Sequence, residues 1–138
     1  MGIFSQKELE YLEKKELLLG RLATALRNRL PHVTPVAYAT DGERLYACTQ
    51  YDSKKARNIR ENPKVSFLVD DYLSWEKIRG VLVSGKAELI LKGKLHQIGR
   101  DLLYKKYPKY QKDYPIQKGG FSEYIFVITP TKVISWGL

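Results

Sequence analysis

Residues 32–49 read HVTPVAYATDGERLYACT, and this stretch decides the fold. His32 to Thr40 is rich in Val, Thr and Tyr, which suit a pleated strand. Asp41-Gly42 is a strong hairpin signal because both positions tolerate positive φ, and Arg44 to Thr49 supplies the returning strand. Leu18 to Leu26 forms a further apolar run before this hairpin. The first half of the chain therefore predicts a three-stranded antiparallel meander.

The remaining sequence predicts short strands and a few peripheral helices. Ser5-Gln6-Lys7-Glu8 has the spacing of a capping box and predicts a helix over about 6–16. Gly85 indicates a bulge, and a long loop containing Trp75 is expected before its strand. Further strands are expected at Val65–Val69, Gly80–Leu91, Glu123–Thr129 and Lys132–Trp136, and further helices at Ser53–Asn62 and Lys94–Tyr107, the latter ended by Pro108. Most strands are joined by turns, so we predict a mainly β fold with peripheral helices, an antiparallel β-barrel.

Composition sets the broad class of the protein. A chain of 138 residues has the size of one domain, and we expect residues 1–138 to fold as a single unit. Apolar stretches are too short for a membrane span, and the N-terminus lacks the features of a secretory signal, so a cytoplasmic location is expected. The chain has one cysteine, Cys48, and two histidines that lie far apart in sequence, so we expect no metal centre. The net charge of +9 attracts nucleic acid, anionic membranes or phosphorylated small molecules alike.

The segment Ser53-Lys54-Lys55-Ala56-Arg57-Asn58-Ile59-Arg60 carries the most chemical information. It places two lysines in the first turn of a predicted helix, where the helix dipole disfavours cations. A bound anion would relieve this charge cluster, and free backbone N–H groups at the helix start favour a phosphate. The alternative is an exposed helix whose basic side chains are solvated.

Several motifs in order resemble one known family. These are Pro31–Val36, Tyr46–Thr49, Ser53–Ile59, Asn62–Ser66 and Arg79–Glu88. Together they are similar to the pyridoxamine 5'-phosphate oxidase-like FMN-binding split-barrel superfamily, in a short form that differs from the oxidase proper. The resemblance implies an antiparallel split β-barrel of the FMN-binding type that forms a homodimer, with cofactor sites at the interface.

The resemblance also implies which residues bind the cofactor. The phosphate is expected at the Ser-Lys-Lys turn, the flavin ring along the strand before the hairpin, and further contacts at three separate positions. In this order, the implied residues are Ser53, Lys54 and Lys55; Thr34, Pro35, Val36 and Ala37; and Thr49, Asn58 and Gly80. Val33 and Tyr38 stand where the oxidase proper has basic residues, which argues against oxidation of pyridoxamine phosphate.

The expected function is FMN binding, with a flavin-dependent oxidoreductase that passes hydride to or from a small molecule as the first hypothesis. No catalytic acid, base or nucleophile is expected, because the flavin itself carries the hydride. Alternatives are a reductase that uses the deazaflavin coenzyme and a flavin carrier without turnover. A nucleic-acid-binding module ranks behind these, and it rests on the lysines and tyrosines of Lys105 to Tyr114.

Overall fold

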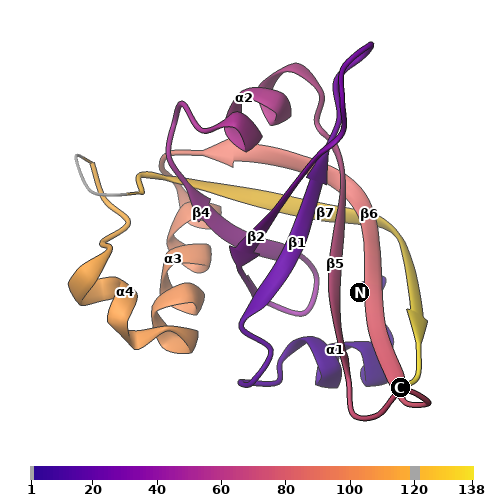
Figure 1. The fold of residues 1–138 in the computed structure, drawn as a ribbon. Helices are drawn as coiled ribbons and strands as arrows, with labels where there is room; N and C mark the ends of the chain where they lie inside the picture. The colour runs from indigo at the N-terminus through magenta and orange to yellow at the C-terminus, as the bar shows by residue number, and fades with distance from the viewer. Residues whose placement is uncertain (1, 119–121) are drawn as a thin grey trace.

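The computed structural model describes residues 2–118 and 122–138, and within them the chain forms one antiparallel sheet with four helices. The strands follow the order β2-β1-β5-β6-β7-β4-β3 across the sheet. The sheet curls into a half-barrel, with α2 across one end, α1 near the other, and α3 and α4 along one side (Figure 1). The strands are β1 (Leu19–Thr24), β2 (His32–Ala37), β3 (Ala39–Thr40), β4 (Leu45–Thr49), β5 (Lys64–Tyr72), β6 (Ile78–Ile90) and β7 (Tyr124–Trp136). The helices are α1 (Gln6–Leu12), α2 (Lys54–Glu61), α3 (Lys94–Lys106) and α4 (Pro108–Asp113).

The predicted meander is wrong in one respect, because the stretch from His32 to Thr40 forms two strands that break at Tyr38. β2 pairs with β1, whereas β3 pairs with β4, so the two strands form opposite edges of the sheet order. The backbone N–H of Tyr38 donates to the hydroxyl of Tyr107 at 3.2 Å rather than to a strand. Since one residue separates β2 from β3, the two edges of the curled sheet must meet here. This is the split in the barrel.

The Tyr38 side chain explains why the break is stable. Its ring is fully buried and meets Phe67 edge-on at 5.5 Å, and its hydroxyl donates to the carbonyl of Leu12 at 2.8 Å. The barrel core surrounds this ring, and a second apolar cluster lies between α3 and the outer face of β4 and β7. Folding therefore buries Tyr38 in the core instead of continuing the strand.

The signals for α1 and for the hairpin are confirmed, but α1 is shorter than expected. The Ser5 hydroxyl accepts from the Glu8 N–H at 3.2 Å, and the Ser5 N–H donates to the Glu8 carboxylate at 2.8 Å, which completes the capping box. The helix ends at Leu12 rather than near residue 16, and the turn that follows buries Leu17. Gly42 adopts φ 93° in the turn between β3 and β4, as the hairpin signal requires.

The second half of the chain has longer strands than the sequence predicts. β5 and β6 are joined by a tight turn in which Leu73 N–H donates to the Lys77 carbonyl, so the long loop around Trp75 is wrong. β7 is one strand instead of two, because the predicted bulge at Gly85 is confirmed and accommodates Pro130 opposite it. Pro108 ends α3 as expected but also begins α4, which the sequence reading missed.

No helix in the described ranges is long and apolar enough to cross a membrane.

Candidate functional site

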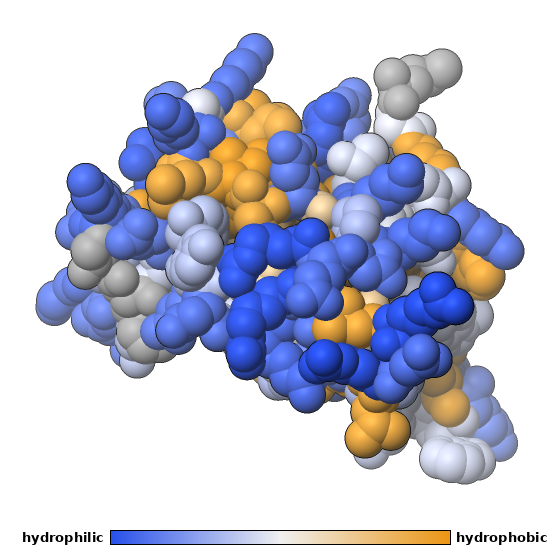
Figure 2. Space-filling view, turned by 90° about the horizontal axis from the view of Figure 1, so that it is seen from above, coloured by the Kyte–Doolittle hydropathy of each residue, from blue (hydrophilic) through white to orange (hydrophobic). Residues whose placement is uncertain are grey.

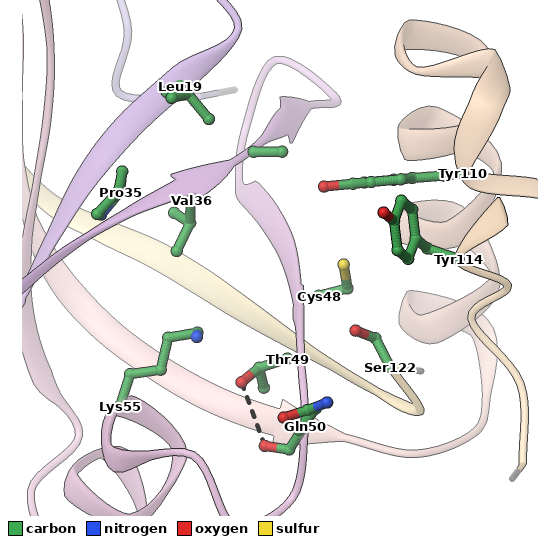
Figure 3. Close-up of a pocket in the computed structure, with 11 residues that line it drawn as sticks. Leu19, Pro35, Val36, Cys48, Thr49, Gln50, Lys55, Tyr110, Tyr114 and Ser122 are labelled. Carbon is green, nitrogen blue, oxygen red and sulfur yellow. Dashed lines mark hydrogen bonds between the residues drawn. The ribbon is translucent and has the colours of Figure 1, made fainter. Parts of the chain in front are cut away.

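A cavity of about 440 Å³ lies at the split of the barrel (Figure 3). Its walls come from the end of β2, the end of β4, the start of α2 and the α4 region. The residues around it are mostly apolar or neutral, with a single charged side chain among those described. They are Leu19, Pro35, Val36, Ala37, Cys48, Thr49, Gln50, Lys55, Tyr110, Tyr114 and Ser122.

Lys55 is the charged residue of this pocket. It lies in the first turn of α2, and its amino group points into the cavity (Figure 3). Burial lowers the pKa of Lys55, because a partly desolvated ammonium is less favourable than one in water. No carboxylate forms a salt bridge with Lys55 in the described part of the chain. The pocket therefore holds a cation without a counter-ion.

Lys54, the other predicted phosphate ligand of this turn, is exposed and does not line the pocket. Neighbouring residues on a helix project about 100° apart, so the two lysines cannot share one direction. The end of the molecule that carries α2 is largely hydrophilic, with apolar patches between the polar side chains (Figure 2).

Ser53 and Thr49 fix the start of α2 against the end of β4. Their hydroxyl oxygens lie 2.8 Å apart, and the Ser53 hydroxyl also accepts from the Ala56 N–H at 3.2 Å. Thr49 lines the pocket, whereas Ser53 lies just behind it as the N-cap of α2. The first backbone N–H groups of a helix have no partner within the helix. Ser53 thus fixes the start of α2, the helix that carries Lys55, against the end of β4.

Three other predicted residues lie elsewhere in the chain. Asn58 is buried and donates to the Thr24 hydroxyl at 2.9 Å, so it fastens α2 to β1. Thr34 pairs with Leu22 in the sheet and does not line the pocket. Gly80 lies near the start of β6, at the end of the sheet opposite α2 (Figure 1). There it packs beneath Trp136, whose ring lies 2.5 Å from the position a Cβ would take.

The pocket also contains residues that the sequence reading missed, above all two tyrosines from the α4 region. The rings of Tyr110 and Tyr114 meet edge-on at 6.1 Å, and Tyr107 lies 5.3 Å from Tyr110. The Tyr110 hydroxyl points into the cavity from the side opposite Lys55 (Figure 3). The i, i+3, i+7 spacing of Tyr107, Tyr110 and Tyr114, with Pro108 at the start of the run, is the signal that could have revealed a helix with an aromatic face.

The same region was the basis of the nucleic-acid alternative, and two of its side chains, Lys106 and Tyr107, point inward. The Tyr107 hydroxyl bonds to the backbone of Tyr38, and the Lys106 ammonium lies 3.6 Å from the centre of the Tyr38 ring. These two groups are therefore not presented to a strand of nucleic acid.

Cys48 contributes a half-buried thiol to the pocket. Burial raises the pKa of Cys48, and a hydrogen bond with Ser122 opposes this effect. The thiol form is therefore favoured, which argues against Cys48 as a reactive nucleophile.

The curled sheet, with a pocket at the split between its two edges, defines a split-barrel protein. The chain belongs to the pyridoxamine 5'-phosphate oxidase family, whose model matches residues 6–137.

Three relatives illustrate this membership. A 5a,11a-dehydrotetracycline/5a,11a-dehydrooxytetracycline reductase of Streptomyces rimosus is 30% identical over 141 residues, which cover 98% of this chain and 84% of the relative. An FAD-binding protein of Mesorhizobium loti is 27% identical, with a TM-score of 0.72 over 96% of this chain and 91% of the other. A conserved hypothetical protein of Mycobacterium tuberculosis is 25% identical, with a TM-score of 0.77 over 98% and 86% of the two chains. A heme-binding protein of Mycobacterium smegmatis and a heme storage protein of Vibrio cholerae share the fold at 19% and 14% identity, so the fold alone does not specify a cofactor.

Proposed function

We propose that the chain binds FMN in the pocket at the barrel split and acts as a flavin-dependent oxidoreductase on a small molecule. The observation that carries this proposal is Lys55, a half-buried cation that faces the cavity and has no carboxylate partner among the described residues. A phosphate would supply the missing negative charge, with the first backbone N–H groups of α2 as further donors. In this proposal the phosphate contacts Lys55 and the first backbone N–H groups of α2. Thr49 lies beside them in the pocket lining, and Ser53 holds the start of α2 in place.

The rest of the pocket suits a planar ring. Pro35, Val36 and Ala37 form one apolar wall, and Tyr110 stands across the cavity. A volume of about 440 Å³ lies in the range of pockets that enclose a small organic ligand. FMN, when bound, would supply the hydride chemistry. The residues of the chain would bind it, orient its ring along β2 and exclude water from one side.

The titratable side chains that line the pocket among the described residues are Cys48, Lys55, Tyr110 and Tyr114. No histidine or carboxylate lines the pocket within residues 2–118 and 122–138. The names of two relatives, an FAD-binding protein and a tetracycline-type reductase, support a flavin and a reduction reaction.

A deazaflavin coenzyme remains the alternative cofactor, and a carrier without turnover the alternative activity. The longer deazaflavin tail would need basic residues beyond Lys55, and Arg57 and Arg60 are the candidates on α2. Arg60 is already committed, because it donates to the Tyr51 carbonyl at 2.8 Å and stacks on the Tyr51 ring at 4.2 Å. This commitment favours FMN.

We also propose that the protein is a homodimer whose partner completes the site. Gly80 and Trp136 lie at the far end of the sheet from Lys55 within one chain. If Gly80 contacts the flavin as the family resemblance implies, a second copy must supply it.

The test is a titration of the purified protein with FMN, read by flavin fluorescence and the visible spectrum. Lys55→Gln should weaken FMN binding by roughly 10- to 150-fold, the equivalent of about 1.5–3 kcal/mol for a hydrogen bond to a charged group. Lys7→Gln is the matched control, since Lys7 is an exposed lysine on α1. Riboflavin, which lacks the phosphate, should bind both variants equally.

Two results would contradict the proposal. Equal FMN affinity in Lys55→Gln and Lys7→Gln would remove the role of Lys55. Tight binding of hemin with no uptake of FMN or deazaflavin would assign a different cofactor. Reduction of the bound flavin by a nicotinamide nucleotide or a substrate then separates an enzyme from a carrier.

A further inference from the structure

A second cavity of about 320 Å³ lies away from the pocket and shares no residue with it. It is enclosed by the end of α1, by β3 and by the last turn of α3. Leu12, Ala39 and Leu102 form its apolar floor. A cavity of this size and lining can take a compact apolar body.

Lys106 is the inner charged residue of this cavity. Its ammonium lies 3.6 Å from the centre of the Tyr38 ring and 5.3 Å from that of Tyr107. No carboxylate forms a salt bridge with it among the described residues. Burial lowers the pKa of Lys106 to about 8. The two aromatic faces therefore compensate only part of the lost hydration.

Two more lysines line the same cavity. Lys15 follows α1 and Lys105 precedes Lys106 on α3, and both are exposed. Glu13 is the one acidic residue of the lining, and it forms no salt bridge with these lysines in the described chain. The cavity thus carries an excess of two positive charges. Lysines in the last turn of α3 gain from the helix dipole, but this does not neutralise their mutual repulsion.

The neutral polar groups around the cavity are already engaged. The Tyr38 hydroxyl donates to the Leu12 carbonyl at 2.8 Å, and the Thr40 hydroxyl donates to the Arg44 carbonyl at 2.7 Å. The Tyr107 hydroxyl bonds to the backbone of Tyr38. The ammonium groups therefore remain as the free donors, and they select a ligand by negative charge.

We propose that this cavity binds a small organic anion, a carboxylate or phosphate ester on a compact apolar body, with Lys106 as its inner contact and Lys15 and Lys105 at the rim. The apolar floor takes the body of the ligand, and the lysines hold its charge. This site is independent of the proposed flavin site.

Isothermal titration calorimetry with phenyl phosphate and with benzoate tests the site, with benzyl alcohol as the neutral probe. We expect at least one of the two anions to bind, benzyl alcohol to bind at least tenfold more weakly, and Lys106→Met to weaken anion binding at least tenfold. Lys106→Arg, which keeps the charge, should retain most of the affinity. Lys55→Gln and Lys7→Gln should leave it unchanged, and the preferred anion identifies the ligand as a phosphate or a carboxylate.

The proposal is overturned if neither anion binds, or if binding is lost in Lys55→Gln and kept in Lys106→Met, because the anion then occupies the first pocket. A similar loss in Lys7→Gln would also overturn it, since binding would then follow net charge alone. Thermal unfolding of each variant verifies that the chain remains folded.

Discussion

Replacing Lys106 by methionine should stabilise the protein at neutral pH. The side chain is half-buried, its pKa is lowered from 10.5 to about 8 by burial, and it lacks a carboxylate partner among the described residues. A lysine whose pKa is lower in the folded state disfavours folding whenever it is protonated. Methionine has similar length and no charge, so it fills the same space without this penalty.

The magnitude follows from the pKa and from the contacts. A decrease from 10.5 to about 8 corresponds to roughly 3 kcal/mol, since each pKa unit is about 1.4 kcal/mol. Partial exposure to solvent reduces this to about 1.5 kcal/mol. Loss of the cation–π contact with Tyr38 removes about 0.5 kcal/mol of stabilisation. The net gain is about 1 kcal/mol, or about 3 °C in Tm for a chain of this size.

Urea unfolding from pH 7 to pH 11 measures this effect. Because the folded state binds fewer protons than the unfolded state between pH 8 and 10.5, wild-type stability rises with pH in that window. The advantage of Lys106→Met should therefore be complete below pH 8 and disappear above about pH 10.5. Lys105→Met, an exposed change in the same turn, is the control and should show neither effect. A variant that is less stable than wild type at pH 7, with no change across this range, would refute the reasoning.

Two further predictions concern side chains that hold the site in place. Asn58→Ala should lower the free energy of unfolding by about 1–3 kcal/mol, because the buried Thr24 hydroxyl loses its partner. Arg57→Ala, a change at an exposed position of the same helix, should have little effect, and equal urea midpoints for the two variants would contradict this prediction. Tyr107→Phe should lower the free energy of unfolding by about 1–3 kcal/mol, because the Tyr38 backbone loses its hydrogen-bond partner, and it should also weaken FMN binding. A variant with wild-type stability and FMN affinity would show that the Tyr107 hydroxyl does not stabilise the split in the barrel.

Local signals predicted the elements of the fold that depend on neighbours in sequence. The Asp41-Gly42 turn, the Ser5 capping box and the Gly85 bulge are each confirmed, because each is determined by a few adjacent residues. The break at Tyr38 was not predictable in this way. It depends on a hydroxyl that lies 69 positions later in the chain, on Tyr107, and on a ring that fills the barrel core. Pairing order across the sheet has the same long-range origin.

The candidate site was predicted in part. Five of the ten expected residues meet in the pocket, namely Pro35, Val36, Ala37, Thr49 and Lys55. Ser53 and Asn58 do not line the pocket but hold α2 in place, through hydrogen bonds to Thr49 and Thr24 respectively. Thr34, Lys54 and Gly80 lie outside it. Their roles toward a cofactor stay predictions, as does the single-domain organisation of residues 1–138. The α4 tyrosines were missed because their region appeared to be a basic loop.

The structure distinguishes the lysines that produce the high net charge by how deeply each is buried. From the sequence, the net charge of +9 does not tell one lysine from another. In the structure, Lys55 and Lys106 are half-buried, line separate cavities and have lowered pKa values because of burial. Lys54 and Lys105, their immediate neighbours, are exposed, because helical rotation turns adjacent residues in different directions. In each pair, one lysine is exposed and the other is half-buried without a carboxylate partner in the described chain, and the half-buried lysine is the one that we propose as the inner contact of an anion.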